Sequence, residues 1–215
     1  EDRRDLPELV AAGARWLGKG ANLLVADAGV AEPVVRLGSA FAAVAHEPLA
    51  DGRTLVRAGA SVDLARLIGR CNDAGLAGLE GLAGVPASLG GAVRMNAGTA
   101  SRWLLDVARR VEVLLPGEET PRWLALADLD VGYRDGGLPG GALVLAVELV
   151  LTPGDPAALR ARASELKRRK AATQPLAERS AGCTFSNPAP ELPAGRLLDE
   201  LGLKGARVGD AEVSA

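Results

Sequence analysis

Apolar and polar positions recur along the chain with both helical and strand spacing. Residues 62–74 have the spacing of an amphipathic helix. Asp63 falls in the first turn of this helix, where a carboxylate suits the helix dipole, and Gly75 follows its end. The apolar face of the helix consists of Leu64, Leu67, Ile68 and Cys71.

Short apolar runs bounded by turn residues predict the strands. Residues 41–45 and 54–58 flank Asp51-Gly52, which is typical of a hairpin turn. Residues 142–151 are apolar throughout and are predicted as a central strand. Further strands are predicted at residues 33–37, 107–115 and 207–213, and further helices at residues 6–16, 155–172 and 195–201. These elements show no regular βαβ alternation, so the sequence favours an α+β fold.

The segment of residues 78–98 holds many glycines and a proline, yet it is too apolar to be a linker. A glycine-rich segment of this kind indicates backbone that lies close to another group. Within it, Gly90 and Gly91 would allow a ligand to approach, and Ser88 could donate to a phosphate oxygen. A tightly packed structural turn is the alternative.

Composition excludes several classes of protein. Lys and Arg number 25 and Asp and Glu 27, so the net charge of -2 gives no electrostatic footprint for nucleic acid. No apolar run approaches the roughly 20 residues of a membrane span, and the first residues do not resemble a secretory signal. Cys71 and Cys183 are far apart and His46 is the single histidine, so we predict no metal site. We expect a cytoplasmic monomer with free thiols.

Residues 18–23 form a glycine-rich break that matches no nucleotide-binding fingerprint in full. A Rossmann fingerprint needs glycine where this chain has Leu23, and Lys19 lacks the glycine spacing and the following Ser or Thr of a P-loop. The backbone N–H groups of this turn could form an anion nest, or the segment is a plain connector.

Three other features are candidates for chemistry. Cys183 lies among turn residues and polar neighbours, which favours a partly exposed thiol that could donate a proton. Arg134 could clamp a carboxylate with its planar guanidinium, or form a surface ion pair with Asp135. The basic run at residues 167–170 is either a solvated helix end or a group that holds a diphosphate.

The order of these segments resembles one enzyme family, the UDP-N-acetylenolpyruvoylglucosamine reductases of peptidoglycan synthesis. Residues 18–25 are similar to the family's Gly-Gly-Gly-Ser-Asn-Leu-Leu-Val turn, and residues 78–98 to its Gly-Leu-Glu, Gly-Ile-Pro-Gly-Thr-Val-Gly-Gly-Ala and Asn-Ala-Gly segments. Residues 132–135 resemble its Tyr-Arg motif, and residues 180–188 its Ala-Gly-Ser-x-Phe-Lys-Asn-Pro loop. Four motifs in the same order and spacing make chance similarity improbable.

The resemblance implies a flavoenzyme of cell-wall synthesis, and hence a role in cell shape and division. FAD and NADPH would reduce the enolpyruvyl ether of UDP-N-acetylglucosamine to UDP-N-acetylmuramate. By resemblance, Arg134 and Cys183 are catalytic: Arg134 sits on the substrate carboxylate and Cys183 delivers the proton. By resemblance, Tyr133, Arg134 and Asn187 bind the substrate. The positions that the resemblance assigns to FAD are Gly18, Lys19, Gly20, Ala21, Asn22, Leu23, Gly84, Val85, Pro86, Ser88, Gly90, Gly91, Asn96 and Gly98.

The resemblance also implies a fold: a two-subdomain FAD-binding fold of the vanillyl-alcohol-oxidase (PCMH) type, followed by an α+β substrate-binding domain. The composition of residues 151–156 places the boundary so that residues 1–152 bind FAD, with subdomains of about 1–38 and 39–152, and residues 153–215 bind substrate. Compared with the family, we expect both ends to be incomplete.

The chain departs from the family pattern at several positions. Cys183 stands where the family has serine, Ala21 replaces a serine of the first turn, and Ser186 replaces a lysine. The family's second catalytic residue, a glutamate near the C-terminus, has no counterpart here, and Glu212 is not that residue. Two alternatives stay open: another FAD-dependent oxidase of the same fold, and a flavin-binding remnant without catalytic activity.

Overall fold

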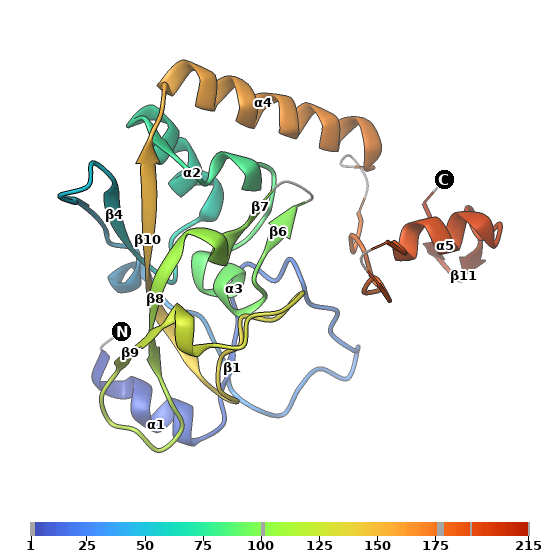
Figure 1. Ribbon diagram of the computed structural model, residues 1–215. Coiled ribbons are helices and arrows are strands. Elements are labelled where there is room, and N and C mark those ends of the chain that lie inside the picture. The colour runs from blue at the N-terminus through green and yellow to red at the C-terminus, as the bar shows by residue number, and fades with distance from the viewer. Residues whose placement is uncertain (1–2, 100–101, 176–178, 190, 215) are drawn as a thin grey trace. The chain divides into compact units, whose positions relative to one another are not determined.

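The computed structural model describes residues 3–99, 102–175, 179–189 and 191–214 (Figure 1). The chain forms two compact units, Glu1–Lys170 and Ala171–Ala215. The first unit contains a six-stranded antiparallel sheet in which β10 (Leu143–Pro153) is central. The other strands are β3 (Val44–Pro48), β4 (Thr54–Gly59), β5 (Leu76–Ala77), β8 (Ala108–Leu114) and β9 (Arg122–Ala125).

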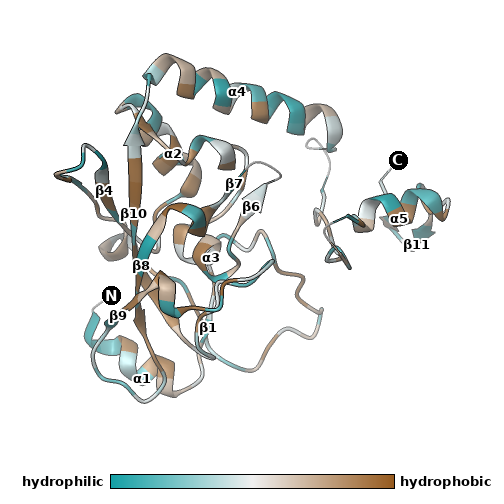
Figure 2. Ribbon diagram, in the orientation of Figure 1, coloured by the Kyte–Doolittle hydropathy of each residue, from teal (hydrophilic) through white to brown (hydrophobic). Residues whose placement is uncertain are grey.

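The strand order is β3-β4-β10-β8-β9, and the short β5 pairs with the end of β10. The predicted hairpin at Asp51-Gly52 is confirmed, since Val44 pairs with Ala58 and Pro48 with Thr54 on either side of it. The predicted central strand is confirmed too, because β10 pairs with both β4 and β8. Figure 2 shows β10 as a mainly apolar strand, as its place in the middle of the sheet requires.

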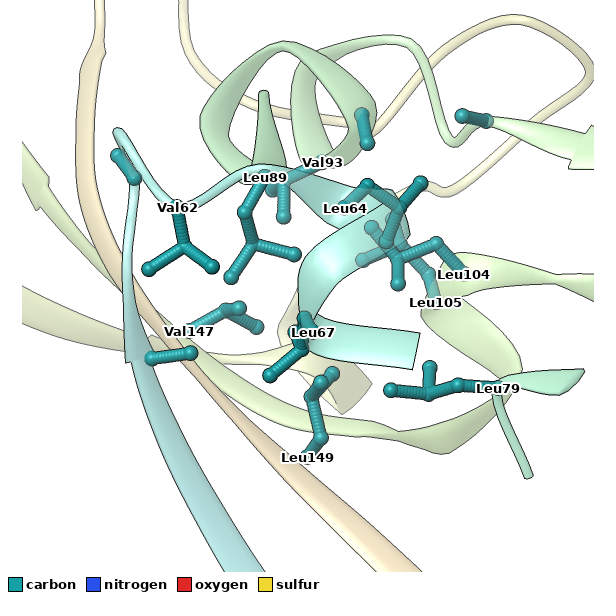
Figure 3. Packing of buried hydrophobic residues seen from close by; sticks show 14 of the residues in the cluster. Val62, Leu64, Leu67, Leu79, Leu89, Val93, Leu104, Leu105, Val147 and Leu149 are labelled. Atoms are coloured by element: carbon teal, nitrogen blue, oxygen red, sulfur yellow. The ribbon is translucent and has the colours of Figure 1, made fainter. Parts of the chain in front are cut away.

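Two helices, α2 (Leu64–Asp73) and α3 (Leu89–Arg94), supply buried side chains to the main hydrophobic core. Four of these side chains are fully buried and pack with side chains of the sheet (Figure 3): Leu64 and Leu67 of α2, and Leu89 and Val93 of α3. The helix predicted at residues 62–74 is therefore confirmed. Asp63 is its N-cap rather than a member of its first turn, and accepts a 2.9 Å hydrogen bond from the Arg66 N–H.

A bulge in β10 lets this strand bury nearly every residue. The pairing with β8 shifts register between Val144 and Ala146. Leu143 and Leu145 lie in a second core with α1 (Leu6–Ala11), whereas Val144 before the shift and Val147 after it lie in the main core. Because neighbouring side chains of a strand point to opposite faces, the extra residue changes which ones face the main core.

The sheet face opposite the main core also carries charge. Arg110 of β8 donates two hydrogen bonds, of 2.7 and 2.8 Å, to the nearly buried carboxylate of Glu148 in β10. The Trp123 ring of β9 lies close to two guanidinium groups, that of Arg110 at 4.6 Å from the ring centroid and that of Arg57 at 4.8 Å. The charged groups are therefore paired and stacked rather than loosely solvated.

Apart from helix α4 (Pro156–Thr173), the remaining elements of the first unit are short. Strands β1 (Arg15–Trp16) and β2 (Val34–Val35) form a parallel pair, and β6 (Gly98–Thr99) and β7 (Arg102–Trp103) an antiparallel pair. Helix α4 carries the basic run. Single-turn 3-10 helices occupy Arg3–Asp5, Ser39–Phe41, Glu80–Leu82, Leu104–Val107 and Leu126–Asp128.

The second unit is small. It contains α5 (Ala194–Glu200) and a hairpin of β11 (Arg207–Val208) and β12 (Ala211–Glu212). Among its described residues none is buried. A single strand was predicted at residues 207–213, but the structure has a two-stranded hairpin there. The chain turns at Gly209, whose φ of +59° suits glycine.

Several boundaries differ from the sequence predictions. The helix predicted at residues 6–16 ends at Ala11, because Gly13 adopts a φ of +71° and the chain turns into β1. Helix α3 and strand β9 were not predicted, since glycines obscure the first and the second is very short. The compact units divide after Lys170 rather than at Pro153, since Leu159 and Ala163 of α4 are buried in the first unit. The assignment of residues 153–215 to substrate binding stays a prediction.

Candidate functional site

Two of the predicted glycine-rich segments meet in space although they lie far apart in sequence. A Cβ atom added to Gly18 would come within 2.4 Å of Ser88 Oγ and 4.0 Å of Gly91 Cα. The turn at residues 18–23 therefore lies directly against the start of α3. Only glycine at position 18 permits this approach without displacing the Ser88 hydroxyl.

The first turn offers donors to a ligand. In the described part of the chain, the backbone N–H groups of residues 18–22 have no protein acceptor. Gly20 adopts a φ of +75°, which turns the backbone as an anion nest requires. The arrangement fits the predicted nest better than a connector with paired amides.

Lys19 is engaged within this turn. Its ammonium forms an ion pair with the Asp63 carboxylate, the same group that caps α2. The Lys19 hydrogen bond and, after it, the Arg66 N–H lower the pKa of Asp63 below its ordinary value. Lys19 thus anchors the turn to α2, and its charge is already matched by a carboxylate.

Ser88 is the N-cap of α3, and its Oγ accepts a hydrogen bond from the Gly91 N–H. The N–H groups of Leu89 and Gly90 donate to the carbonyls of Val62 and Ala60, at 2.8 Å each. These backbone amides are consequently not open to a phosphate. The Ser88 hydroxyl hydrogen is not used in the bond with Gly91, and its predicted donation to a phosphate oxygen stays a prediction.

Two further glycines of the predicted cofactor set are explained by internal packing. A Cβ atom on Gly90 would lie 2.8 Å from the Ala60 Cβ. Gly84 has a φ of +88°, and its carbonyl accepts a 2.6 Å hydrogen bond from Lys170 Nζ. The end of the basic run of α4 therefore lies on the Gly84 turn, next to Val85 and Pro86.

The Tyr-Arg motif forms a turn with strained backbone. Arg134 adopts a φ of +59°, an uncommon value for a residue with a side chain. Gly132 and Asp135 close the turn with backbone hydrogen bonds of 3.0 and 3.3 Å. The exposed Tyr133 ring meets Trp103 edge-on at 5.8 Å between centroids, and the Arg134 guanidinium lies 5.8 Å from the Tyr133 centroid. No carboxylate in the described chain pairs with Arg134, so the surface ion pair with Asp135 is not formed.

Asn96 and Gly98 join the glycine-rich segment to this turn. The Asn96 Nδ2 donates to the Gly132 carbonyl at 3.2 Å, and its Oδ1 accepts from the Leu105 N–H at 3.3 Å. A Cβ atom on Gly98 would lie 2.1 Å from the Trp103 ring. Their predicted contact with a cofactor stays a prediction, and these internal contacts account for both residue types.

The loop that carries Cys183 belongs to the second unit. Cys183 is exposed, as predicted, whereas Cys71 is buried in α2, where burial raises the pKa of its thiol to about 11. Asn187 accepts a 3.0 Å hydrogen bond from the Ala194 N–H at the start of α5. The structure brings Gly18, Lys19, Ser88 and Gly91 together, and describes Cys183 and Asn187 separately as members of the second unit.

Three contributors to the site were missed from sequence. Asp63 anchors Lys19, Trp103 packs on Gly98 and Tyr133, and Lys170 holds Gly84. The predicted place of Asp63 at the start of its helix was the one available signal, because all three contacts join segments remote in sequence. An open depression of about 660 Å³ lies elsewhere, between the β3–β4 hairpin and the start of β8, and contains none of the predicted site residues.

Apolar side chains are also exposed beside the first turn. Leu23, Leu24 and Val25 are 60%, 86% and 61% exposed. Such a run next to open N–H groups suits a ligand with both a flat apolar part and an anionic part. Among the described residues, no helix combines the length and the apolar character needed to cross a membrane.

Comparison with known proteins supports the predicted family. The family model for the C-terminal domain of UDP-N-acetylenolpyruvoylglucosamine reductase matches residues 174–215. The reductase of that name from Thermus thermophilus is 42% identical over 214 residues, which cover 100% of this chain and 76% of the relative. One from Anaeromyxobacter dehalogenans is 45% identical over 195 residues, covering 91% of this chain, and the match spans 57% of the relative's length.

Solved structures agree with this result. The crystal structure of the reductase from Thermus caldophilus superposes with a TM-score of 0.86 and 41% identity, over 100% of this chain and 76% of that one. A solvent-stable cholesterol oxidase has a TM-score of 0.52 at 20% identity, over 65% of this chain and 30% of its own, which shows a likeness of fold alone. The predicted α+β fold is confirmed, and the chain belongs to the UDP-N-acetylenolpyruvoylglucosamine reductase family.

Proposed function

We propose that this chain binds FAD and, with NADPH, reduces UDP-N-acetylglucosamine enolpyruvate to UDP-N-acetylmuramate in the synthesis of peptidoglycan precursors. The observation that carries the proposal is the meeting of Gly18 with Ser88 and Gly91. Motifs about seventy residues apart in sequence meet there and form one surface, the flavin-binding cradle, made of residues 18–22 and the Ser88–Gly91 start of α3. The backbone N–H groups of residues 18–22 are open beside it. When bound, FAD would carry the hydride from NADPH to the methylene carbon of the enolpyruvyl group.

The residues present fit FAD. Its pyrophosphate needs N–H donors and space close to the backbone, and residues 18–22 with glycine at positions 18 and 20 supply both. The Ser88 hydroxyl can donate beside them. The flavin ring needs apolar contact, and the exposed Leu23, Leu24 and Val25 lie next in the chain. Ala21 provides no hydroxyl to this set.

Arg134 would bind the carboxylate of the enolpyruvyl group. Its guanidinium has no protein carboxylate to pair with among the described residues, and a planar donor suits a carboxylate that gains enolate character. Tyr133, next to Arg134, would also contact the substrate, and so would Asn187, which lies in the same loop as Cys183.

Cys183 would deliver the proton. Hydride addition at the methylene carbon leaves enolate charge next to the carboxylate, and the adjacent carbon must then be protonated. Cys183 is a free, exposed cysteine, and it stands where the resembling motif of the family has serine. A thiol is more acidic than an alcohol, so this transfer is chemically accessible. In this proposal residues 1–152 form the flavin-binding part and residues 153–215 the part that binds substrate.

Anaerobic visible spectroscopy tests the proposal. The purified chain, loaded with FAD, is recorded alone, after NADPH, and after the enolpyruvyl substrate. We expect the flavin band to bleach with NADPH and to return with the substrate. A chain that takes up no FAD, or a bleached band that the substrate leaves unchanged, would contradict the proposal. Flavin binding without reduction would indicate a non-catalytic binder, and oxygen consumption with sugars would indicate an oxidase.

A further inference from the structure

We propose that α3 positions the Arg134 turn, and that Asn96 is a positioning residue for Arg134 rather than a ligand of the cofactor. The inference deepens the proposed function and rests on it for the role of Arg134. Its structural part, that the Asn96 hydrogen bond to Gly132 fixes the turn, can be tested without catalysis.

Helix α3 is fixed at its N-terminal end. Leu89 and Val93 are fully buried in the main core (Figure 3). The Leu89 and Gly90 N–H groups donate to the Val62 and Ala60 carbonyls at 2.8 Å each. The helix therefore cannot shift without disturbing the core.

The other end of α3 contacts the Arg134 turn on both sides. The Arg94 carbonyl accepts a 3.0 Å hydrogen bond from the Gly136 N–H. The Asn96 Nδ2 donates to the Gly132 carbonyl at 3.2 Å. Arg94 also donates through Nη1 to the carbonyls of residues 138 and 139, at 3.3 and 3.2 Å. These contacts bracket Tyr133 and Arg134 in the sequence.

Both functional groups of the Asn96 amide face the protein. The residue is 6% exposed, and its Oδ1 accepts a hydrogen bond from the Leu105 N–H in addition to the bond made by Nδ2. Its φ of +38° belongs to the left-handed region, which asparagine tolerates better than most residues. The amide thus bridges the buried Leu105 and the turn.

Arg134 needs such support because its own backbone is strained. A non-glycine residue with a φ of +59° persists only where its surroundings fix it. Gly136 is part of that support, since a Cβ atom there would lie 2.3 Å from the Val93 carbonyl oxygen. Asn96, Arg94 and Gly136 together determine where the guanidinium stands. A displacement of a catalytic group by about 1 Å can cost roughly a hundredfold in rate. Substitution of these residues should therefore lower the rate even though none of them contacts the substrate.

The variant Asn96→Asp tests the bridge. It keeps an acceptor for the Leu105 N–H and replaces the donor to Gly132 with an oxygen. We expect faster hydrogen–deuterium exchange in residues 130–137 of the flavin-free chain, with residues 62–73 unchanged. Asn72→Asp is the matched control, because Asn72 is also a buried asparagine but lies in α2. Unchanged protection of residues 130–137 in Asn96→Asp would overturn the proposal.

Kinetics separate positioning from cofactor binding. We expect Asn96→Asp to lower kcat/KM for the enolpyruvyl substrate by about tenfold or more, with FAD affinity within about twofold of the wild type. In combination with Arg134→Lys the losses should not add, because both act on one group. A parallel loss of FAD affinity would make Asn96 a cofactor ligand, and additive losses would show that it acts independently of Arg134. Either result would overturn the proposal.

A second variant covers the case in which Asn96→Asp does not fold. Gly136→Ala pushes the turn away from α3 through its backbone and leaves the Asn96 side chain intact. It should raise exchange in residues 130–137 and lower kcat/KM without loss of FAD binding. Failure of the wild type itself to bind or reduce FAD would contradict the proposed function, while the exchange experiment would still decide the structural part.

Discussion

The two units of the chain hold their predicted catalytic residues in different ways. In the first unit, Arg134 lies in a turn that is tied to α3 and through it to a large hydrophobic core. In the second unit no described residue is buried, and the Cys183 loop is held by local hydrogen bonds such as that from the Gly182 N–H to Ser180 Oγ, at 3.1 Å. Side-chain position is set by the core in one unit and by short-range turns in the other.

This difference separates stability from function. Substitutions in the first unit should change the free energy of unfolding, and with it everything that depends on the fold. Substitutions in the second unit should change chemistry while leaving that free energy nearly constant. Turnover, the free energy of unfolding and its pH dependence should therefore respond differently to substitutions in the two units.

Replacement of the Cys183 thiol should abolish proton delivery. Cys183→Ala should lower turnover by about 10²- to 10⁴-fold, the usual contribution of a general acid, with no change in the urea midpoint. Cys183→Ser restores the family's residue and should recover part of the rate. Steady-state turnover measured alongside urea unfolding checks both statements. An alanine variant with full turnover would remove Cys183 from the proposed chemistry.

A cavity in the main core should destabilise the first unit. Leu89 is 0% exposed, so Leu89→Ala should cost about 2–5 kcal/mol through lost burial and the cavity left behind. Leu201 is 70% exposed in the second unit, and Leu201→Ala should cost less than about 0.5 kcal/mol. Chemical denaturation of the two variants measures this difference. Equal losses would show that the second unit shares the core's stability.

Two arginine–glutamate pairs offer the same contrast for charge. Glu148 has a side chain 4% exposed, and Arg110→Met would leave it without its partner. We expect a loss of about 2–3 kcal/mol, below the value for a fully buried pair because Arg110 itself is 42% exposed. Arg196 and Glu200 in α5 are 64% and 52% exposed, so Arg196→Met should cost less than about 0.5 kcal/mol. Denaturation curves of the two variants measure the losses in free energy of unfolding. Similar losses would contradict the expected difference between the buried and the exposed pair.

The Lys19–Asp63 pair should make stability depend on acid pH. The pKa of Asp63 is lowered in the folded state, so its contribution is fully present above the ordinary pKa of about 3.9 and is lost as pH falls through the lower folded value. Asp63→Asn keeps an N-cap residue and removes the charge. It should cost about 1 kcal/mol at neutral pH, and this difference should shrink as the pH falls below the ordinary pKa of about 3.9. Asp199→Asn, in the exposed pair with Lys204, is the control. Urea midpoints that show the same pH dependence with and without Asp63 would contradict this assignment.

The sequence predicted the regular part of the fold for physical reasons. The helix at residues 62–74 had a clear apolar face, a carboxylate near its start and Gly75 after its end, and the apolar run at residues 142–151 suits the interior of a sheet. Helix α3 escaped prediction because its glycines lower helix propensity, and it is stabilised instead by tertiary contacts of Leu89 and Val93. The bulge in β10 had no local signal.

The candidate site was predicted as a set of residues but not as a geometry. The motifs at residues 18–23 and 84–98 identified the segments, whereas their contact at Gly18 and Ser88 depends on long-range packing. The same holds for the bond from Asn96 to Gly132, which joins segments 36 residues apart. Local pattern indicates which residues carry chemistry, and the tertiary fold decides which of them support others.

The central claim is that the Gly18 turn and the start of α3 form one flavin-binding cradle. The most direct measurement is an equilibrium titration of the flavin-free chain with FAD, followed by visible absorbance, for the wild type, Gly18→Ala and Gly140→Ala. Gly140 has open space around it and no positive φ, so it is a matched glycine control. We predict that the wild type and Gly140→Ala bind alike, and that Gly18→Ala binds at least about tenfold more weakly, a loss of about 1.4 kcal/mol. Binding by Gly18→Ala equal to that of the wild type, or no binding by the wild type, would contradict the account.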